Sequence, residues 1–199
     1  MEYYDVLSKR RMYRHFDSEP VPIEALDKIL HSATRAPSAG FTQGSDFLVL
    51  TDPGALERFW NLALTSEWKA RTTSHENLWQ APVVVLPLAN PQAYVDRYAE
   101  PDKSYSNLIT EGDWPVPYWH IDTAFATMLI LNAVVNERLG ALFFGLFRNV
   151  DLIKSAFGIP ANYIPIGAIA IGHPIKEEHS NPTRRTKREL LSQLHMNHF

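Results

Sequence analysis

The chain has 199 residues and contains no cysteine. This absence excludes disulfides, thiolate nucleophiles, cysteine-bound zinc and iron–sulfur clusters, and it is compatible with a reducing compartment. Apolar runs of membrane-spanning length are also missing, and the mean hydropathy is -0.21. Residues 1–14 are charged and aromatic, without the apolar core of a secretion signal. We therefore expect a cytoplasmic protein that does not contact a membrane.

Positive charge is not in excess, because the chain has 19 Lys and Arg residues and 22 Asp and Glu residues, which gives a net charge of -3. A generally basic surface for nucleic acid is thereby excluded, so any anion site must be local. Arginine binds phosphate in a planar, bidentate fashion. Either folding joins the two basic clusters into a phosphate site, or both are solvated surface runs. The clusters are Lys9, Arg10, Arg11 and Arg14, and Arg184, Arg185, Lys187 and Arg188.

The usual phosphate and catalytic signatures are absent as well. The chain has no G-x-G-x-x-G, no G-x-x-x-x-G-K-[ST], no G-x-S-x-G and no H-E-x-x-H. His195 and His198 are more typical of an exposed chain end than of a metal site, and Ser38 has no identifiable base to make it a nucleophile. We expect no metal, and the Rossmann and P-loop folds are weak candidates.

Apolar periodicity predicts helices that alternate with strands around one sheet. No repeat, low-complexity tract or flexible linker divides the chain, so we expect one domain over residues 1–199, of class α/β or α+β. The predicted helices span residues 21–35, 53–71, 121–138 and 149–157, the predicted strands span 47–50, 83–88 and 164–172, and residues 184–194 are helical or extended.

The predicted helix over residues 121–138 is apolar on almost every side, which is typical of a helix buried all round. Asp122 and Asn132 lie inside this apolar pattern. A subunit interface explains such a helix better than lipid does.

Residues 91–119 combine an irregular pattern with six aromatic side chains, and we expect a long loop there. Such flat apolar faces suit the stacking of a conjugated substrate, and long ordered loops often carry function. The alternative is an arm that braces a partner subunit. The six aromatics are Tyr94, Tyr98, Tyr105, Trp114, Tyr118 and Trp119.

Several motifs in order resemble the flavin-dependent nitroreductase family, whose pattern is R-R-S-x-R-x-F, then P-V-P, then A-P-S-x-x-N-x-Q-P. Here these are residues 10–16 (RRMYRHF), 20–22 (PVP) and 36–43 (APSAGFTQ). The resemblance continues nearly to the end of the chain, through residues 80–82 (QAP), 139–147 (LGALFFGLF), 158–160 (GIP) and 169–174 (IAIGHP).

The resemblance implies an α+β, nitroreductase-like fold: a central, mostly antiparallel sheet flanked by helices, in an intertwined homodimer with FMN at the subunit interface. It further implies an oxidoreductase that uses NAD(P)H to reduce nitro compounds, quinones or similar conjugated acceptors in a ping-pong cycle. The flavin N5 carries the chemistry in this family, so no catalytic side chain is expected.

Residue by residue, the resemblance places Arg10, Arg11 and Arg14 on the flavin phosphate and ribityl chain, with Arg14 reaching the pyrimidine edge. Residues 37–38 contribute from the other subunit, and a backbone amide near Gly145 approaches N5. From the residues alone, the favoured interpretations are an ordinary helix-terminating turn over residues 37–40 and a strand bulge at Gly145. The predicted cofactor set is Arg10, Arg11, Met12, Arg14, Pro37, Ser38, Ala39, Phe41, Gln43, Phe144, Gly145, Leu146, Arg184 and Arg185; the predicted substrate contacts are Phe41, Trp114 and Tyr118.

The chain departs from the family pattern at four positions. Met12 replaces a Ser, Phe41 an Asn, Gly44 a Pro and Asp46 an aromatic residue. The first two changes remove polar groups, and Phe41 is expected to lie against the ring or to seal the pocket. Three other functions stay open: different flavin chemistry such as reductive dehalogenation or flavin breakdown, a flavin-binding module without turnover, and a nucleic-acid binder.

Overall fold

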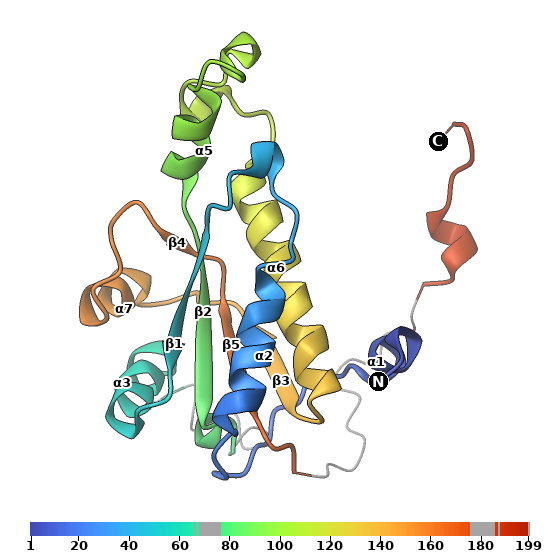
Figure 1. The fold of residues 1–199 in the computed structure, drawn as a ribbon. Coiled ribbons are helices and arrows are strands. Elements are labelled where there is room, and N and C mark those ends of the chain that lie inside the picture. The colour runs from blue at the N-terminus through green and yellow to red at the C-terminus, as the bar shows by residue number, and fades with distance from the viewer. Residues whose placement is uncertain (66, 68–76, 176–185, 187, 199) are drawn as a thin grey trace.

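The computed structural model describes residues 1–65, 67, 77–175, 186 and 188–198, and it has an α+β architecture around one sheet (Figure 1). The sheet order is β1-β2-β5-β3, with β4 also paired to β2, and every pair of strands is antiparallel. The strands are β1 (Ser45–Leu50), β2 (Val83–Ala89), β3 (Gly140–Phe144), β4 (Ile164–Pro165) and β5 (Ala168–Gly172).

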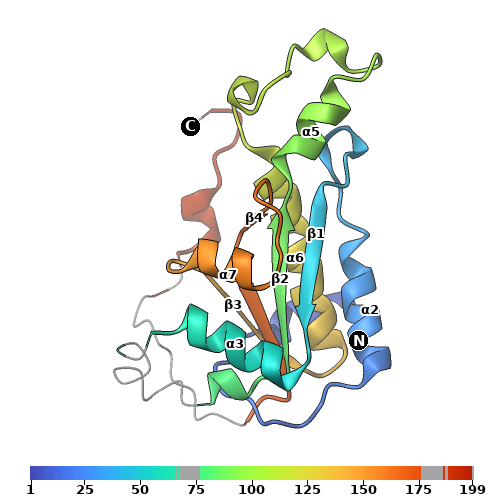
Figure 2. The same cartoon turned by 90° about the vertical axis from the view of Figure 1, so that its left-hand side faces the viewer.

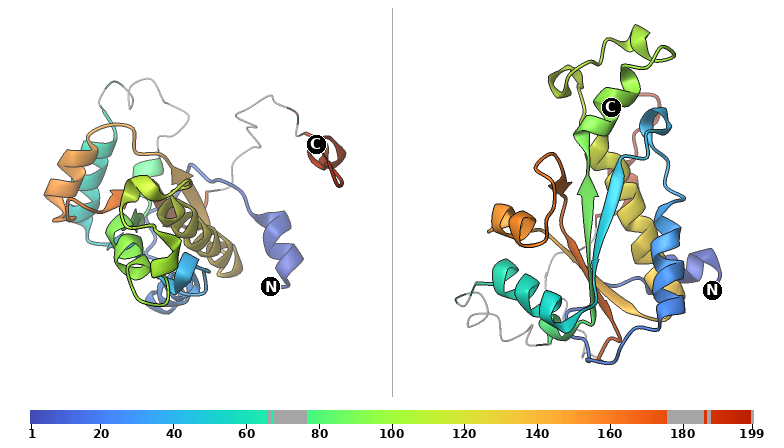
Figure 3. Two further views of the ribbon diagram at one scale, coloured as in Figure 1. Left: turned by 90° about the horizontal axis from the view of Figure 1, so that it is seen from above. Right: turned by 60° about the vertical axis from the view of Figure 1, so that its left-hand side comes forward.

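Helices cover both faces of the sheet, as Figure 2 shows: α2 (Ile23–Ala33) and α6 (Tyr118–Asn136) lie on one face, and α3 (Pro53–Ala63) and α7 (Val150–Ala156) lie on the other. Helix α5 (Pro91–Tyr98) follows β2 beyond the end of the sheet. Helix α1 (Tyr3–Lys9) stands apart from the sheet on the α6 side (Figure 3). Short 3-10 helices are Ala39–Phe41, Leu78–Gln80, Ser104–Ser106, Glu111–Asp113 and Leu190–Gln193.

Side chains alternate along the central strands, and this alternation builds two cores. Val84 and Leu86 pack under α3 and α7, whereas Val83 and Val85 pack under α2 and α6. Because both faces are covered, every residue of β2 is buried. A near-continuous apolar run is the pattern expected of such a strand.

The predicted helices over 21–35, 121–138 and 149–157 and the strands over 47–50 and 83–88 are confirmed to within a few residues. The helix predicted over 53–71 ends at Ala63, because Leu64 is extended (φ -114°, ψ 112°) and its side chain joins the core. The strand predicted over 164–172 is interrupted between β4 and β5. Helix α1 and strand β3 were not predicted.

The prediction of a long loop over 91–119 is wrong for its first part. Asn90 caps α5 by accepting a hydrogen bond from the backbone N–H of Ala93 (3.4 Å), and Pro91 occupies the first turn. Asparagine followed by proline is a helix-start signal that the sequence already contained. The prediction of a loop followed the aromatic composition of the segment and overlooked this helix-start signal.

Candidate functional site

The basic segment after α1 runs alongside β3. Met12 forms a parallel bridge to Ala141, and the backbone N–H of Tyr13 donates to the Ala141 carbonyl (3.0 Å). Side chains of an extended segment alternate in direction. Met12 packs into the cores while Arg14 and Arg11 line two different cavities. The basic residues are therefore divided between two sides of the segment.

Arg14 lines a cavity of about 460 Å3 between the end of α3 and β3. Its half-buried guanidinium donates to the Met12 carbonyl (3.2 Å). The Phe144 ring in this cavity is stacked against the buried Trp60 ring, with centroids 5.6 Å apart and planes at 17°. The cavity is lined by Arg14, Ala63, Leu64, Thr65, Leu78, Leu142, Phe143, Phe144, Gly145, Phe147 and Arg148.

The lining of this cavity is mostly apolar and carries positive charge. Among its described lining residues only Arg14 and Arg148 carry a charge, and both charges are positive. A Cβ atom added at Gly145 would meet the exposed Phe147 ring, so a larger residue there would need this ring to move. The cavity thus suits a flat conjugated ring that carries or gains negative charge.

Arg11 lies elsewhere, in a cavity of about 580 Å3 that Lys9 and Arg138 also line. Its guanidinium donates to the carbonyls of Ser8 (2.6 Å) and Arg10 (2.9 Å). Arg10 is half-buried at the end of α1. The extended backbone thus directs Arg11 and Arg14 into different cavities of the chain. That Arg10, Arg11 and Arg14 contact the flavin stays a prediction. Arg184 and Arg185 lie outside the described residues.

The turn over residues 37–43 lies between α2 and α6, where Pro37, Ser38 and Gln43 line a cavity of about 240 Å3. No described residue lines both this cavity and the one beside Gly145. The turn is on the α2 and α6 face, and the Gly145 cavity is on the α3 face. The two halves of the predicted cofactor site therefore do not meet within one chain.

A buried carboxylate that was not among the predicted site residues holds this turn. Asp122 is 4% exposed, and its Oδ2 atom accepts hydrogen bonds from the Ala39 backbone N–H (2.8 Å) and the Tyr94 hydroxyl (2.8 Å). Burial raises the pKa of Tyr94 well above its usual value, and Asp122 raises this pKa further. The available signal was a lone carboxylate inside an otherwise apolar helix.

The predicted substrate residues are placed differently from one another. Trp114 is buried, and its ring packs against Tyr98 (centroids 4.6 Å apart), Tyr94 and Trp119. The prediction that Trp114 offers a face to a substrate is thus not supported, because neighbouring rings occupy its surface. Tyr118 is 40% exposed and Phe41 is 76% exposed, so both remain available to a ligand.

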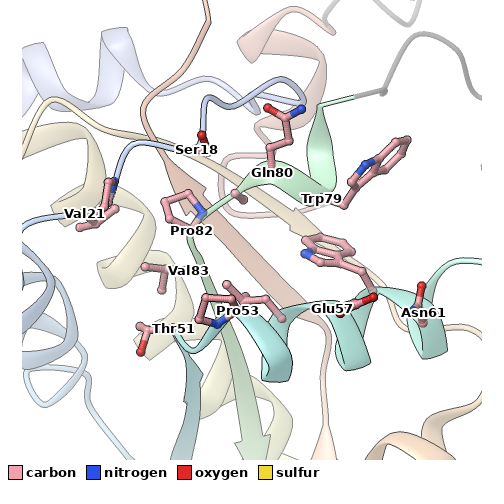
Figure 4. A pocket seen from close by; sticks show the side chains of 14 residues that line it. Ser18, Val21, Thr51, Pro53, Glu57, Asn61, Trp79, Gln80, Pro82 and Val83 are labelled. Atoms are coloured by element: carbon pink, nitrogen blue, oxygen red, sulfur yellow. The ribbon is translucent and has the colours of Figure 1, made fainter.

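A further cavity of about 470 Å3 lies between α3 and the start of β2 (Figure 4). The side chains of Glu57, Trp79 and Pro82 are among those that line it, and none of the predicted site residues does. Its Glu57 carboxylate is the only charged group among its described lining residues. Size alone does not distinguish this cavity from the one beside Gly145, but the positive charge of Arg14 and Arg148 favours the latter.

A sequence model of the Nitroreductase family matches residues 7–173. The chain belongs to the nitroreductase family. It is 24% identical to the iodotyrosine deiodinase of Nematostella vectensis over 195 residues, which covers 96% of this chain and 74% of that protein. Against the iodotyrosine deiodinase 1 of pig, orangutan and human, this family member spans 62% of their length.

Solved structures share the fold. A nitroreductase-like protein of Streptococcus mutans superposes with a TM-score of 0.75 at 16% identity, covering 98% of each chain. The FMN complex of a nitroreductase from Desulfovibrio desulfuricans has a TM-score of 0.71 at 22% identity, covering 100% of this chain and 98% of that one. The expected antiparallel α+β fold is thereby confirmed.

The described residues contain no helix long and apolar enough to cross a bilayer. They also contain no group of three His, Asp or Glu side chains suited to a metal ion.

Proposed function

We propose that this nitroreductase-family protein is an FMN-dependent oxidoreductase that uses NAD(P)H to reduce a conjugated organic acceptor. The observation that carries the proposal is the cavity beside Gly145, with its apolar floor and the Arg14 cation. Its volume of about 460 Å3 lies within the range of about 300–1,000 Å3 typical of small-molecule sites. The FMN complex of the Desulfovibrio relative supports the choice of cofactor.

The residues present fit a bound flavin. FMN supplies the hydride-transfer chemistry when bound, so the protein needs to provide position and charge. Phe144 would form part of the floor under the ring, and the missing side chain of Gly145 would allow the backbone to approach it. Arg14 would stabilise negative charge that develops on the ring during reduction, because a preorganised cation in a partly buried site acts at reduced dielectric.

A homodimer would complete the site. Phe125 and Met128 on α6 are 47% and 39% exposed, and the Asn132 Oδ1 atom is buried without a hydrogen-bond partner among the described residues. An exposed apolar helix face beside an unsatisfied polar atom is typical of a subunit interface. In the proposed dimer, residues 37–43 of one subunit would join the Gly145 cavity of the other.

The acceptor proposed is a flat conjugated molecule such as a nitroaromatic or a quinone. Phe41 and Tyr118 supply exposed aromatic faces that stack on such a ring. Reductive dehalogenation of a halogenated aromatic is the second candidate, because the relatives found by sequence include iodotyrosine deiodinases.

The test is a visible spectrum of the purified protein, with and without added FMN, followed by anaerobic addition of NADH or NADPH. We expect a bound flavin whose absorbance is bleached by at least one nicotinamide. The reduced protein is then mixed with a nitroaromatic, a quinone and an iodophenol in separate experiments. A protein that takes up no FMN would contradict the proposal, and turnover of the iodophenol alone would favour the second candidate.

A further inference from the structure

The turn that carries Phe41 is anchored by residues 91–122. The Arg97 Nε–H donates to the Gly40 carbonyl (2.9 Å). The same guanidinium donates through Nη1 and Nη2 to the two oxygens of Asp102 (2.8 Å each), and through Nη1 to Glu100 (3.1 Å). Only 22% of the Arg97 side chain is exposed. A bidentate arginine pair of this kind has a defined geometry, so the anchor on Gly40 is directional.

A second anchor acts one residue earlier, where the Ala39 backbone N–H donates to the buried Asp122. Packing adds a third restraint, because a Cβ atom at Gly40 would lie 2.8 Å from the Tyr98 ring. The turn is therefore held at two consecutive residues by three groups that are distant in sequence.

The backbone of the turn needs such anchors. Gly40, Phe41 and Gln43 have φ values of 62°, 56° and 55°, all in the left-handed region. For a residue other than glycine this region costs about 1–2 kcal/mol. Phe41 and Gln43 both bear that cost, so the surrounding bonds must hold the conformation.

The strain does not serve to bury Phe41, because its side chain is 76% exposed. Residues 91–122 instead hold the backbone that carries Phe41, with its ring exposed outside the body of the chain. An exposed aromatic held in this way is suited to contact a molecule that the chain itself does not contain.

We propose that Arg97 and Asp122 are positioning residues that determine acceptor preference by fixing the place of Phe41. This inference rests on the proposed function, and it assigns the role of residues 91–119 to bracing the turn. Arg97 lines neither the Gly145 cavity nor the cavity at the turn, so it would act on the acceptor only through the turn. Asp122 lines the cavity at the turn but not the Gly145 cavity.

The first experiment compares two quinones of different bulk, p-benzoquinone and menadione, with the FMN-loaded protein. Arg97→Ala should change the ratio of their kcat/KM values by about threefold or more, because the Phe41 ring no longer has a set position. Glu100→Gln is the matched control, since it removes only the negative charge of one partner of Arg97 and should leave the ratio unchanged. Arg97→Lys, which retains the charge but not the Nε–H, should shift the ratio in the same direction as Arg97→Ala.

A double-mutant cycle then tests whether the effect passes through Phe41. Residues that act on a shared element are not additive. Phe41→Ala should change the ratio by itself, and adding Arg97→Ala in that background should change it no further. An Arg97→Ala effect of the same size with and without the Phe41 ring would overturn the inference.

Hydrogen exchange of the FMN-loaded protein provides a measurement without acceptor. In the turn, the backbone N–H groups of Ala39, Phe41, Thr42 and Gln43 are hydrogen-bonded. Arg97→Ala and Asp122→Asn should each speed the exchange of these amides about tenfold, as expected when a local opening becomes easier. Unchanged exchange in an Arg97→Ala variant that still turns over would refute the inference alone. A wild type that reduces no acceptor would refute the proposed function and the inference together.

Discussion

The hydrogen bond between Tyr94 and Asp122 leads us to predict how the stability of the protein changes at alkaline pH. Tyr94 is fully buried, and its hydroxyl donates to the Asp122 carboxylate at 2.8 Å. Tyr94→Phe removes this bond while retaining the ring, so no large cavity forms. A hydrogen bond to a charged group contributes about 1.5–3 kcal/mol, and we expect the free energy of unfolding to fall by about 2 kcal/mol at pH 8.

The direction of the pH effect follows from the raised pKa of Tyr94. In the unfolded chain this tyrosine ionises near pH 10, whereas in the folded protein it stays protonated. The contribution of Tyr94 is fully present below pH 10 and is lost as the pH rises above it, by about 1.4 kcal/mol for each pH unit. The Tyr94→Phe variant does not lose stability in this way, because phenylalanine has no hydroxyl to ionise. The difference between the two proteins should therefore shrink from about 2 kcal/mol at pH 8 to about 0.6 kcal/mol at pH 11.

Urea unfolding at pH 8, 10 and 11 measures this difference, at one protein concentration because subunit association also affects stability. The other tyrosines are common to both proteins, so their titration cancels. Tyr105→Phe is the control: Tyr105 is 79% exposed, and its removal should change stability little at any pH. A Tyr94→Phe difference that stays constant from pH 8 to pH 11 would refute the assignment of a protonated, buried Tyr94.

Three other outcomes are expected. Arg10→Ala should weaken FMN binding by about 2 kcal/mol, or roughly thirtyfold, and leave riboflavin binding unchanged, because only FMN has a phosphate; equal losses for both ligands in a titration would move the phosphate elsewhere. Phe125→Asp should dissociate the proposed dimer in sedimentation, since it places a charge on the exposed face of α6; a dimer unaltered by this change would locate the interface on another face. Trp114→Ala should lower stability by about 3–5 kcal/mol through loss of core packing, whereas Tyr118→Ala should change the KM for the acceptor with flavin content and melting temperature retained; the reverse pattern would restore Trp114 as a substrate contact.

Several elements could be predicted from the sequence because their signals are local. Helix α2 has apolar residues at helical spacing, and β2 is a continuous apolar run between a proline and an asparagine. Helix α6 is apolar all round. One side of it packs on the sheet, whereas Phe125 and Met128 are exposed on another side. The order of the motifs likewise indicates the nitroreductase family without reference to the fold.

The site depended on tertiary structure. The arginines of the basic motif all lie within residues 10–14, but the bridge from Met12 to Ala141 directs Arg11 and Arg14 into different cavities. The bond from Arg97 to Gly40 joins residues 57 positions apart, and that from Asp122 to Ala39 joins residues 83 positions apart. Local periodicity determines which face of an element is buried, whereas only packing decides which distant groups meet there. For this reason the motif residues were identified from the sequence, and their division between two faces of the sheet was not.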